Sequence, residues 1–124
     1  MTFLIIRAYL LLLSFEWPIA RRDFGNVYRR VRDRSVRATD LRFPPFEPLC
    51  YAVNVACAAY LKQVQCLQRS AALVCLLRDR GVPASLVIGA QHIPFNGHAW
   101  VEVDGEIVND HRANLEKYIV LDRC

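Results

Sequence analysis

Residues 66–81 read CLQRSAALVCLLRDRG and predict the helix at the centre of the fold. The side chains of this segment are apolar on nearly every side of a helix, which is typical of a helix buried between other elements. Gly81 and the nearby Pro83 are residues that commonly follow the end of a helix. We therefore expect a buried helix that begins near Cys66 and ends near Arg80.

Strands are expected after this helix. The expected strands are residues 85–91, 98–103, 107–110 and 118–121. Their β-branched and aromatic residues favour extended structure. Asp104-Gly105 predicts a hairpin between the second and the third strand. One central helix against a small antiparallel sheet indicates an α+β domain.

Helices are also expected before the central one. The expected helices are residues 3–14, residues 18–34 with Pro18 in the first turn, and residues 47–62. Apolar residues recur at helical spacing in the last of these, and proline is favoured in the first turn of a helix. Two adjacent prolines within residues 41–46 forbid helix continuation, so a joint is expected there.

The composition fits one globular domain. The chain has 124 residues, of which 54% are hydrophobic, so it is long enough for one buried core but leaves little room for a second. We expect a single domain over residues 1–124. It would consist of an N-terminal helical layer, residues 1–45, and a core, residues 46–124, that carries the candidate site.

Positive charge is concentrated near the N-terminus. Residues 1–42 contain nine arginines and four acidic residues, whereas residues 43–124 are close to neutral. This excess fits a solvated helix face, an acidic peptide, an anionic partner or a membrane surface. We do not expect a nucleic-acid partner, because acidic residues interrupt the arginine-rich stretch and it carries no recognised motif.

The cysteines and the first residues favour a cytoplasmic location. Five cysteines are an odd number and none forms a C-x-x-C pair, so neither a disulfide framework nor a zinc site is expected. Residues 1–14 imitate a signal peptide, but Arg7 interrupts the apolar run and Glu16-Trp17-Pro18 is not a cleavage site. The run is also shorter than the ~20 residues that a bilayer requires.

Cys66, His98 and Asp110 are the candidate catalytic residues. Cys66 starts a predicted helix, whose N-terminus favours a thiolate over a thiol. His98 begins a predicted strand and would act as general base toward the thiol and as general acid toward a leaving amine. Asp110, or the neighbouring Asn109 in its place, would orient the imidazole. A cysteine, its base and an orienting group are typical of a cysteine peptidase.

The text around these residues resembles the leader peptidases, or B proteins, of lasso-peptide biosynthesis, a branch of the transglutaminase-like superfamily. The matching segments are Cys-Leu-x-Arg-Ser, Arg-Gly-Val-x-Ala-x-Leu-Val-Ile-Gly and His-Ala-Trp-Val-Glu-Val-Asp-Gly-x-x-Val-Asn-Asp, between residues 65 and 110. The resemblance implies a transglutaminase-like or papain-like core. It also implies a thiol protease that removes the leader from a ribosomally made precursor peptide.

The resemblance further implies partner proteins. Family members carry a leader-binding domain in the same chain or in a separate protein, and the helical residues 1–45 do not look like that domain. We therefore interpret this chain as the stand-alone (B2-type) peptidase, which needs a small leader-binding protein. A lasso cyclase would use the released core peptide together with ATP. No cofactor or metal is expected in this chain, which has no H-E-x-x-H motif.

Several other residues are candidates for supporting roles. An oxyanion hole would use the N–H of Cys66 and a side-chain amide, and Gln63 and Gln65 are both available. Arg69 is expected to make a structural ion pair or a substrate-side contact. Trp100 is expected to pack beside the catalytic imidazole and is, with Arg69, a candidate for the substrate side of the site.

Two other functions use the same residues or the same fold. Acyl transfer to an amine, as in transglutaminases or arylamine acetyltransferases, would proceed through the same acyl-enzyme, and the three residues do not reveal whether water or an amine accepts the acyl group. A catalytically silent module that only binds the precursor is the third possibility.

The hairpin at Asp104-Gly105 bears on the direction of Asp110. A two-residue loop would place His98 and Asp110 on opposite faces of the sheet, because side chains alternate along a strand. A loop of odd length, or an equivalent bulge, would place them on one face. We expect the odd-length loop, with Gly105 at positive φ and the Asp110 carboxylate within hydrogen-bonding reach of His98.

Overall fold

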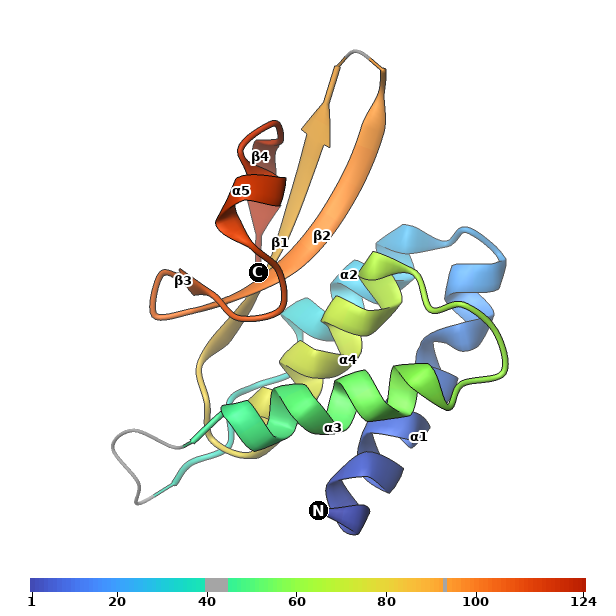
Figure 1. Cartoon of the computed structure of the whole chain (residues 1–124), viewed down its shortest axis with the longest axis vertical. Helices are drawn as coiled ribbons and strands as arrows, with labels where there is room; N and C mark the ends of the chain where they lie inside the picture. The colour runs from blue at the N-terminus through green and yellow to red at the C-terminus, as the bar shows by residue number, and fades with distance from the viewer. Residues whose placement is uncertain (40–44, 93) are drawn as a thin grey trace.

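Helix α4 (Cys66–Asp79) lies at the centre of the molecule (Figure 1). The computed structural model describes residues 1–39, 45–92 and 94–124. Residues 70–78 of α4 are all buried, and the helix contacts both the sheet and the N-terminal helices. The predicted central helix is confirmed.

The strands form one antiparallel sheet in the order β3-β2-β1-β4. They are β1 (Ala84–Gln91), β2 (Asn96–Val103), β3 (Glu106–Ile107) and β4 (Ile119–Arg123). Ala99 and Val101 of β2 enter the core that α4 shares, whereas Trp100 packs with Val87 and Leu115 in a second cluster. The expected α+β class, with a central helix on a small antiparallel sheet, is confirmed.

In the described part of the chain, three helices precede α4, and all of them contact it. They are α1 (Thr2–Ala20), α2 (Phe24–Arg32) and α3 (Glu47–Ala58). The predicted boundary between the first two helices is wrong, because α1 continues through Pro18. The predicted break over residues 41–46 falls mainly on residues 40–44, which lie outside the described residues.

Pro18 is tolerated inside α1 because α2 compensates for its missing N–H. In a regular helix the N–H of residue 18 would bind the carbonyl of Ser14. Arg30 of α2 binds this carbonyl instead, with its Nη1 donating at 2.8 Å. Its Nη2 also donates to the Ser14 hydroxyl at 3.1 Å. A partner distant in sequence thus satisfies the carbonyl that the proline leaves open.

By length and composition, α1 could cross a membrane. The expectation that its apolar run is too short is therefore wrong, since the helix extends to Ala20. One third (33%) of its most apolar window is buried inside the domain, where α1 packs against α3 and α4. A buried core helix passes the same test of length and composition.

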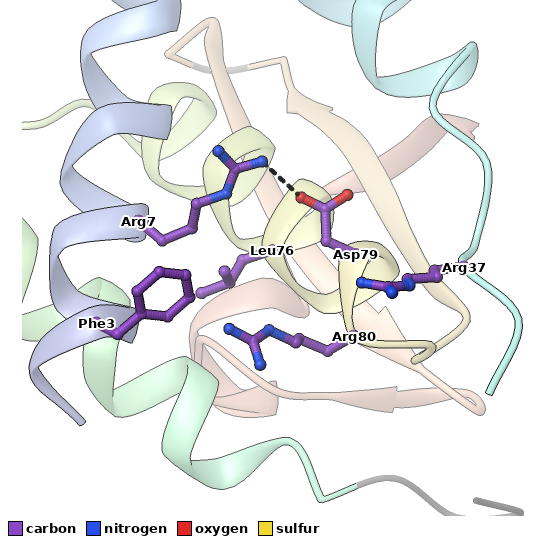
Figure 2. Close-up of a pocket in the computed structure, with 6 residues that line it drawn as sticks. All are labelled: Phe3, Arg7, Arg37, Leu76, Asp79 and Arg80. Atoms are coloured by element: carbon purple, nitrogen blue, oxygen red, sulfur yellow. Dashed lines mark hydrogen bonds and ion pairs between the residues drawn. The ribbon is translucent and has the colours of Figure 1, made fainter. Parts of the chain in front are cut away.

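Asp79 ties the C-terminal end of α4 to the N-terminal part of the chain. Arg34 donates to both Asp79 oxygens, at 3.0 and 2.6 Å, and Arg7 of α1 donates at 3.3 Å (Figure 2). Burial works to raise the pKa of Asp79, but the two arginines outweigh it and hold the pKa below its ordinary value.

The β2–β3 hairpin has a two-residue loop, so the expected loop of odd length is wrong. Val103 pairs with Glu106, and both loop residues have positive φ, 54° at Asp104 and 80° at Gly105. Positive φ at both positions is typical of a type I′ turn, the usual loop for an Asp-Gly hairpin.

A two-residue loop was expected to place His98 and Asp110 on opposite faces of the sheet. This does not happen, because β3 is short. The predicted strand over residues 107–110 ends at Ile107, and the chain bends over the next three residues. Alternation along a strand therefore no longer governs the direction of Asp110. An unpredicted short helix, α5 (Arg112–Leu115), follows.

Candidate active site

Cys66 is the first residue of α4, and Gln65 is its N-cap with an extended backbone. No side chain of a described residue caps this end of the helix, so its first N–H groups are available to a ligand. Cys66, Gln65 and His98 line one cavity of about 580 Å³. The start of the helix thus brings a thiol and backbone donors to the same cavity as an imidazole.

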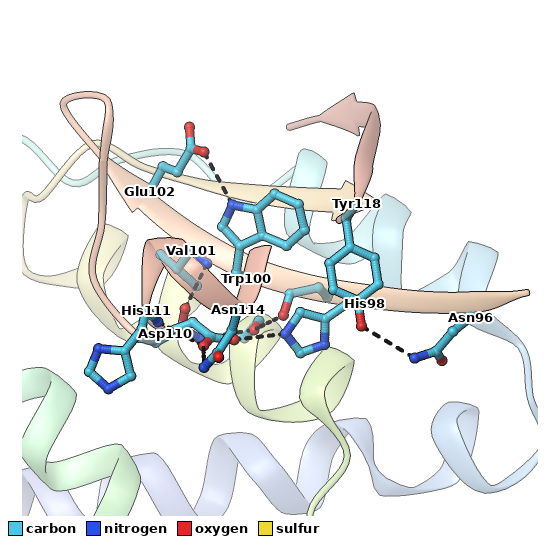
Figure 3. Close-up of polar contacts among 12 residues, drawn as sticks. Asn96, His98, Trp100, Val101, Glu102, Asp110, His111, Asn114 and Tyr118 are labelled. Carbon is cyan, nitrogen blue, oxygen red and sulfur yellow. Dashed lines mark hydrogen bonds and ion pairs between the residues drawn. The ribbon is translucent and has the colours of Figure 1, made fainter. Parts of the chain in front are cut away.

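His98 in β2 is held by Asp110. The Nε2 of His98 lies 2.7 Å from Oδ2 of Asp110 (Figure 3). The two side chains are only 20% and 13% exposed, so water competes weakly for this contact. Because Nε2 is engaged, Nδ1 is the ring nitrogen left for a thiol. The expected contact is present although the expected loop is not.

Asp110 is fixed through its second oxygen as well. Its Oδ1 accepts from the backbone N–H of His111 at 2.7 Å and from Nδ2 of Asn114 at 3.2 Å. Burial works to raise the pKa of Asp110, but the hydrogen bonds from His98, His111 and Asn114 outweigh it and the pKa lies below its ordinary value. The carboxylate is therefore ionised at neutral pH.

Asn109, the alternative to Asp110, is engaged elsewhere. Its Oδ1 accepts from the N–H of Val101 at 2.9 Å, and its Nδ2 donates to the hydroxyl of Ser70 at 3.0 Å. Ser70 in turn donates to the carbonyl of Ala99 at 3.2 Å. These bonds connect α4, β2 and the segment after β3. In the described contacts, the His98 imidazole therefore bonds to Asp110 and not to Asn109.

Two aromatic rings pack near the His98 imidazole. Tyr118 stacks on it with 5.2 Å between ring centroids and 22° between ring planes, and the Trp100 centroid lies at 6.1 Å. Gly89, which pairs with His98 across the sheet, makes room for the indole, because a Cβ there would lie 2.8 Å from two Trp100 ring atoms. The expected position of Trp100 is present, whereas Tyr118 was not predicted.

The apolar walls of the cavity come from residues that the sequence did not single out. Phe24 and Tyr28 of α2, Ile88 of β1 and Phe95 form these walls. Phe24 and Tyr28 are four residues apart and share one face of α2, which is the signal that could have identified them. A hydrogen bond to Asp122 raises the pKa of Tyr28 to about 12, so this wall is neutral at physiological pH.

The candidates for supporting roles separate in space. Gln65 lines the cavity, whereas Gln63 does not, so the geometry favours Gln65 as the side-chain donor. Arg69 does not line the cavity either. Its Nε is buried and has no hydrogen-bond partner among the described residues. The expected ion pair of Arg69 is not found in the part of the chain that the structure describes.

Cys66 differs in its surroundings from the other cysteines. All five thiols are free. Burial raises the pKa of Cys50, Cys57, Cys75 and Cys124, and none of these four lines the cavity. Within the described ranges, no group of three His, Cys, Asp or Glu side chains is arranged to hold a metal ion.

A family model and a curated relative both match this chain. The profile of the transglutaminase-like superfamily covers residues 9–123. The microcin J25-processing protein McjB of Escherichia coli is 49% identical over 56 residues, which are 45% of this chain and 27% of McjB. The match thus spans about a quarter of that relative. No solved structure matches the chain. The resemblance to lasso-peptide processing proteins is confirmed, and the chain belongs to the transglutaminase-like superfamily.

Proposed function

We propose that this protein is a cysteine peptidase that removes the leader from a lasso-peptide precursor. The observation that carries the proposal is the His98–Asp110 pair, 2.7 Å apart, on the cavity that Cys66 also lines. The similarity to McjB, a microcin J25-processing protein, supports a ribosomally made peptide as the substrate. Membership of the transglutaminase-like superfamily supports chemistry at the thiol.

The first half of the reaction transfers the leader to the enzyme. His98 takes the thiol proton, and the Cys66 sulfur attacks the carbonyl carbon of the scissile peptide bond. The N–H of Cys66 and the Gln65 amide stabilise the oxyanion that forms. The imidazolium then gives its proton to the leaving nitrogen. The C–N bond breaks, the core peptide leaves with a free amine, and the leader remains as a thioester.

The second half returns the enzyme to its starting state. A water molecule gives a proton to His98 and its oxygen attacks the thioester carbonyl. The C–S bond breaks, the leader leaves with a new carboxyl group, and the proton returns to the Cys66 sulfur. Asp110 stabilises the imidazolium in both halves.

Cys66 and His98 line the same cavity. The described contacts include no hydrogen bond between Cys66 and His98. Catalytic hydrogen bonds are often long in free enzymes and tighten in the complex. We therefore infer that substrate binding brings the His98 Nδ1 to the thiol. The apolar walls around Phe24, Ile88 and Phe95 favour an uncharged side chain beside the scissile bond.

The proposal includes two partner proteins. A small leader-binding protein would deliver the precursor and raise its effective concentration at the cavity. A lasso cyclase would consume ATP and use the amine that the peptidase releases. We place the protein in the cytoplasm, because its five free thiols are stable in a reducing compartment.

The first prediction tests the nucleophile. The chain is incubated with the precursor, with and without the leader-binding partner, and the products are measured by mass spectrometry. We expect wild-type protein to yield leader and core whose masses sum to the precursor plus one water, faster with the partner. Cys66→Ala should yield neither product. Cys57→Ala, the same change at a thiol outside the cavity, should remain active.

Each other result has a definite meaning. Full activity of Cys66→Ala would end the peptidase assignment. A leader product that carries an added amine in place of water would show acyl transfer. If no product forms and iodoacetamide labels Cys66 no faster than the other four thiols at neutral pH, the protein is a silent binding module.

A further inference from the structure

The outer side of α1 exposes a row of large apolar side chains. Phe3, Ile6, Leu10, Leu13 and Trp17 are between 40% and 67% exposed. Their spacing of three and four residues places them along one side of the helix, over a length of roughly 21 Å. We call these five residues the α1 stripe. A contiguous exposed apolar patch on a small domain marks an interaction surface.

The opposite side of α1 belongs to the hydrophobic core. Its residues Ala8, Leu11, Leu12, Phe15 and Ile19 are buried and pack in the cluster that α3 and α4 share. A membrane span would withdraw these side chains from that core. If α1 meets a membrane, it therefore lies on the surface with the stripe facing the lipid.

Arginines surround a cavity at the N-terminal end of the stripe (Figure 2). The cavity has a volume of about 500 Å³ and is lined by Phe3, Arg7, Arg37, Leu76, Asp79 and Arg80. Asp79 is the one carboxylate among the described lining residues, and it already receives two bonds from Arg34 and one from Arg7. The cavity therefore carries an excess of positive charge.

Among the described contacts, Asp79 binds Arg7 but neither Arg37 nor Arg80. Neither Arg37 nor Arg80 forms a side-chain ion pair with another described residue. The guanidinium of Arg80 lies over the ring of Phe3, at 5.5 Å from the centroid, so this cation borders the stripe directly. A guanidinium binds phosphate oxygens through two parallel hydrogen bonds.

The other end of the stripe is basic too. Arg21 lies over the Trp17 ring at 4.6 Å, and Arg22 is exposed. The only acidic residue of α1, Glu16, is bound by Lys62 at 2.6 Å and does not offset these charges. An apolar face with arginines at both ends matches an anionic bilayer, which offers hydrocarbon below a layer of phosphates.

We propose that α1 binds the surface of an anionic membrane. The α1 stripe enters the acyl region, and the cavity of Arg7, Arg37 and Arg80 takes the phosphate of a lipid headgroup. The sheet and its hairpins lie on the other side of α4 from α1 (Figure 1), so the membrane does not cover them. This property is independent of the peptidase reaction.

Sedimentation with vesicles tests the proposal. The full chain is mixed with vesicles of phosphatidylcholine alone or with added phosphatidylglycerol. We expect binding to the anionic vesicles only, and weaker binding as salt rises. Leu10→Glu should weaken binding at least about tenfold. Arg37→Gln and Arg80→Gln should each weaken it roughly fivefold.

Matched variants on the sheet side are the controls. Leu121→Glu and Arg112→Gln make the same chemical changes at exposed positions outside α1 and should bind as wild type does. Circular dichroism and thermal unfolding identify any variant that fails to fold, and Ile6→Glu replaces Leu10→Glu in that case.

Three results would overturn the proposal. The first is no binding to anionic vesicles, or a loss of vesicle binding in the control variants as large as the loss in Leu10→Glu, Arg37→Gln and Arg80→Gln. The second is a rise in thermal stability with inorganic phosphate but no vesicle binding, which would make the cavity a site for a soluble anion. The third is an oligomer in solution that Leu10→Glu dissociates while vesicles do not bind, which would assign the stripe to a protein.

Discussion

Both oxygens of Asp110 already have partners, and this determines which residue orients His98. One oxygen contacts the imidazole, and the other accepts from His111 and Asn114. The carboxylate therefore has little freedom to rotate away. Asn109 next to it is equally occupied, by Val101 and Ser70. The orienting group is thus assigned by hydrogen bonds between atoms and not by residue type.

The second prediction separates the two neighbours. Asp110→Asn should lower kcat by roughly 10²- to 10⁴-fold with the fold intact, because a neutral amide stabilises the imidazolium poorly. Asn109→Ala should instead cost about 1–3 kcal/mol of stability, since it leaves buried partners open, with a smaller effect on kcat. Leader-release kinetics and urea unfolding measure both effects. If Asn109→Ala loses as much kcat as Asp110→Asn at full stability, Asn109 orients the imidazole.

The third prediction concerns Gly89, which leaves space for the Trp100 ring. In Gly89→Ala the new methyl group would lie 2.8 Å from that ring, so Trp100 must move and the packing around His98 must change. We expect a loss of about 1–3 kcal/mol in stability, a change in tryptophan fluorescence and a lower kcat. Gly97→Ala is the control for stability and fluorescence, because a Cβ there meets its nearest neighbour only at 3.9 Å. Equal behaviour of the two variants would contradict this role of Gly89.

At the scale of helices, α1 and α2 depend on each other through Pro18. The proline leaves the Ser14 carbonyl without its helical donor, and Arg30 of α2 donates to it. Arg30 also covers the Phe15 ring at 4.1 Å. These contacts hold α2 against α1, and α2 carries Phe24 and Tyr28 to the cavity.

The fourth prediction is a double-mutant cycle on this contact. Arg30→Met should cost about 1 kcal/mol in the wild-type background, because the Ser14 carbonyl loses its donor. In Pro18→Ala the restored backbone N–H binds that carbonyl, so the same change should cost less. The contact of Arg30 with Phe15 is lost in both backgrounds and cancels. Urea unfolding measures the coupling, and strict additivity would refute this account of how α1 tolerates its proline.

At the scale of the whole molecule, carboxylates with lowered pKa connect distant elements. Glu16 of α1 has a lowered pKa mainly through its bond with Lys62. Asp79 joins α4 to Arg34 and Arg7, and Asp110 joins the segment after β3 to β2. Because the pKa of each is lower in the folded than in the unfolded chain, their ionised forms stabilise the fold.

The fifth prediction is the dependence of stability on pH. These carboxylates add to the free energy of unfolding in full at pH values above their pKa in the unfolded chain. This stabilisation is lost as the pH falls through their pKa in the folded chain. The urea midpoint should therefore change little from about pH 7 to 5 on account of these carboxylates, and fall below about pH 4. Asp79→Asn should be less stable than wild type at neutral pH, and the difference should shrink in acid. A constant difference would rule out the ion pairs of Asp79 as its cause.

Local patterns in the chain were sufficient to predict the central helix, three of the four strands to within a few residues, and the α+β class. Each depends on neighbours in sequence: apolar residues around α4, alternation along β2, and Gly81 after the helix. The same local text predicted Cys66 at a helix start and the resemblance to lasso-peptide processing proteins. Predicting these features did not require knowing which segments of the chain contact one another in the folded protein.

Contacts between distant segments account for the remainder. Pro18 stays in α1 because Arg30 reaches Ser14 from another helix. Asp110 reaches His98 because β3 ends at Ile107, which releases the chain from strand alternation. The walls of the cavity come from α2, β1 and the β1–β2 hairpin, and the exposure of the α1 stripe depends on which side of α1 packs on α4. Periodicity along the chain records which residues are apolar, but burial and hydrogen-bond partners depend on how whole elements pack together.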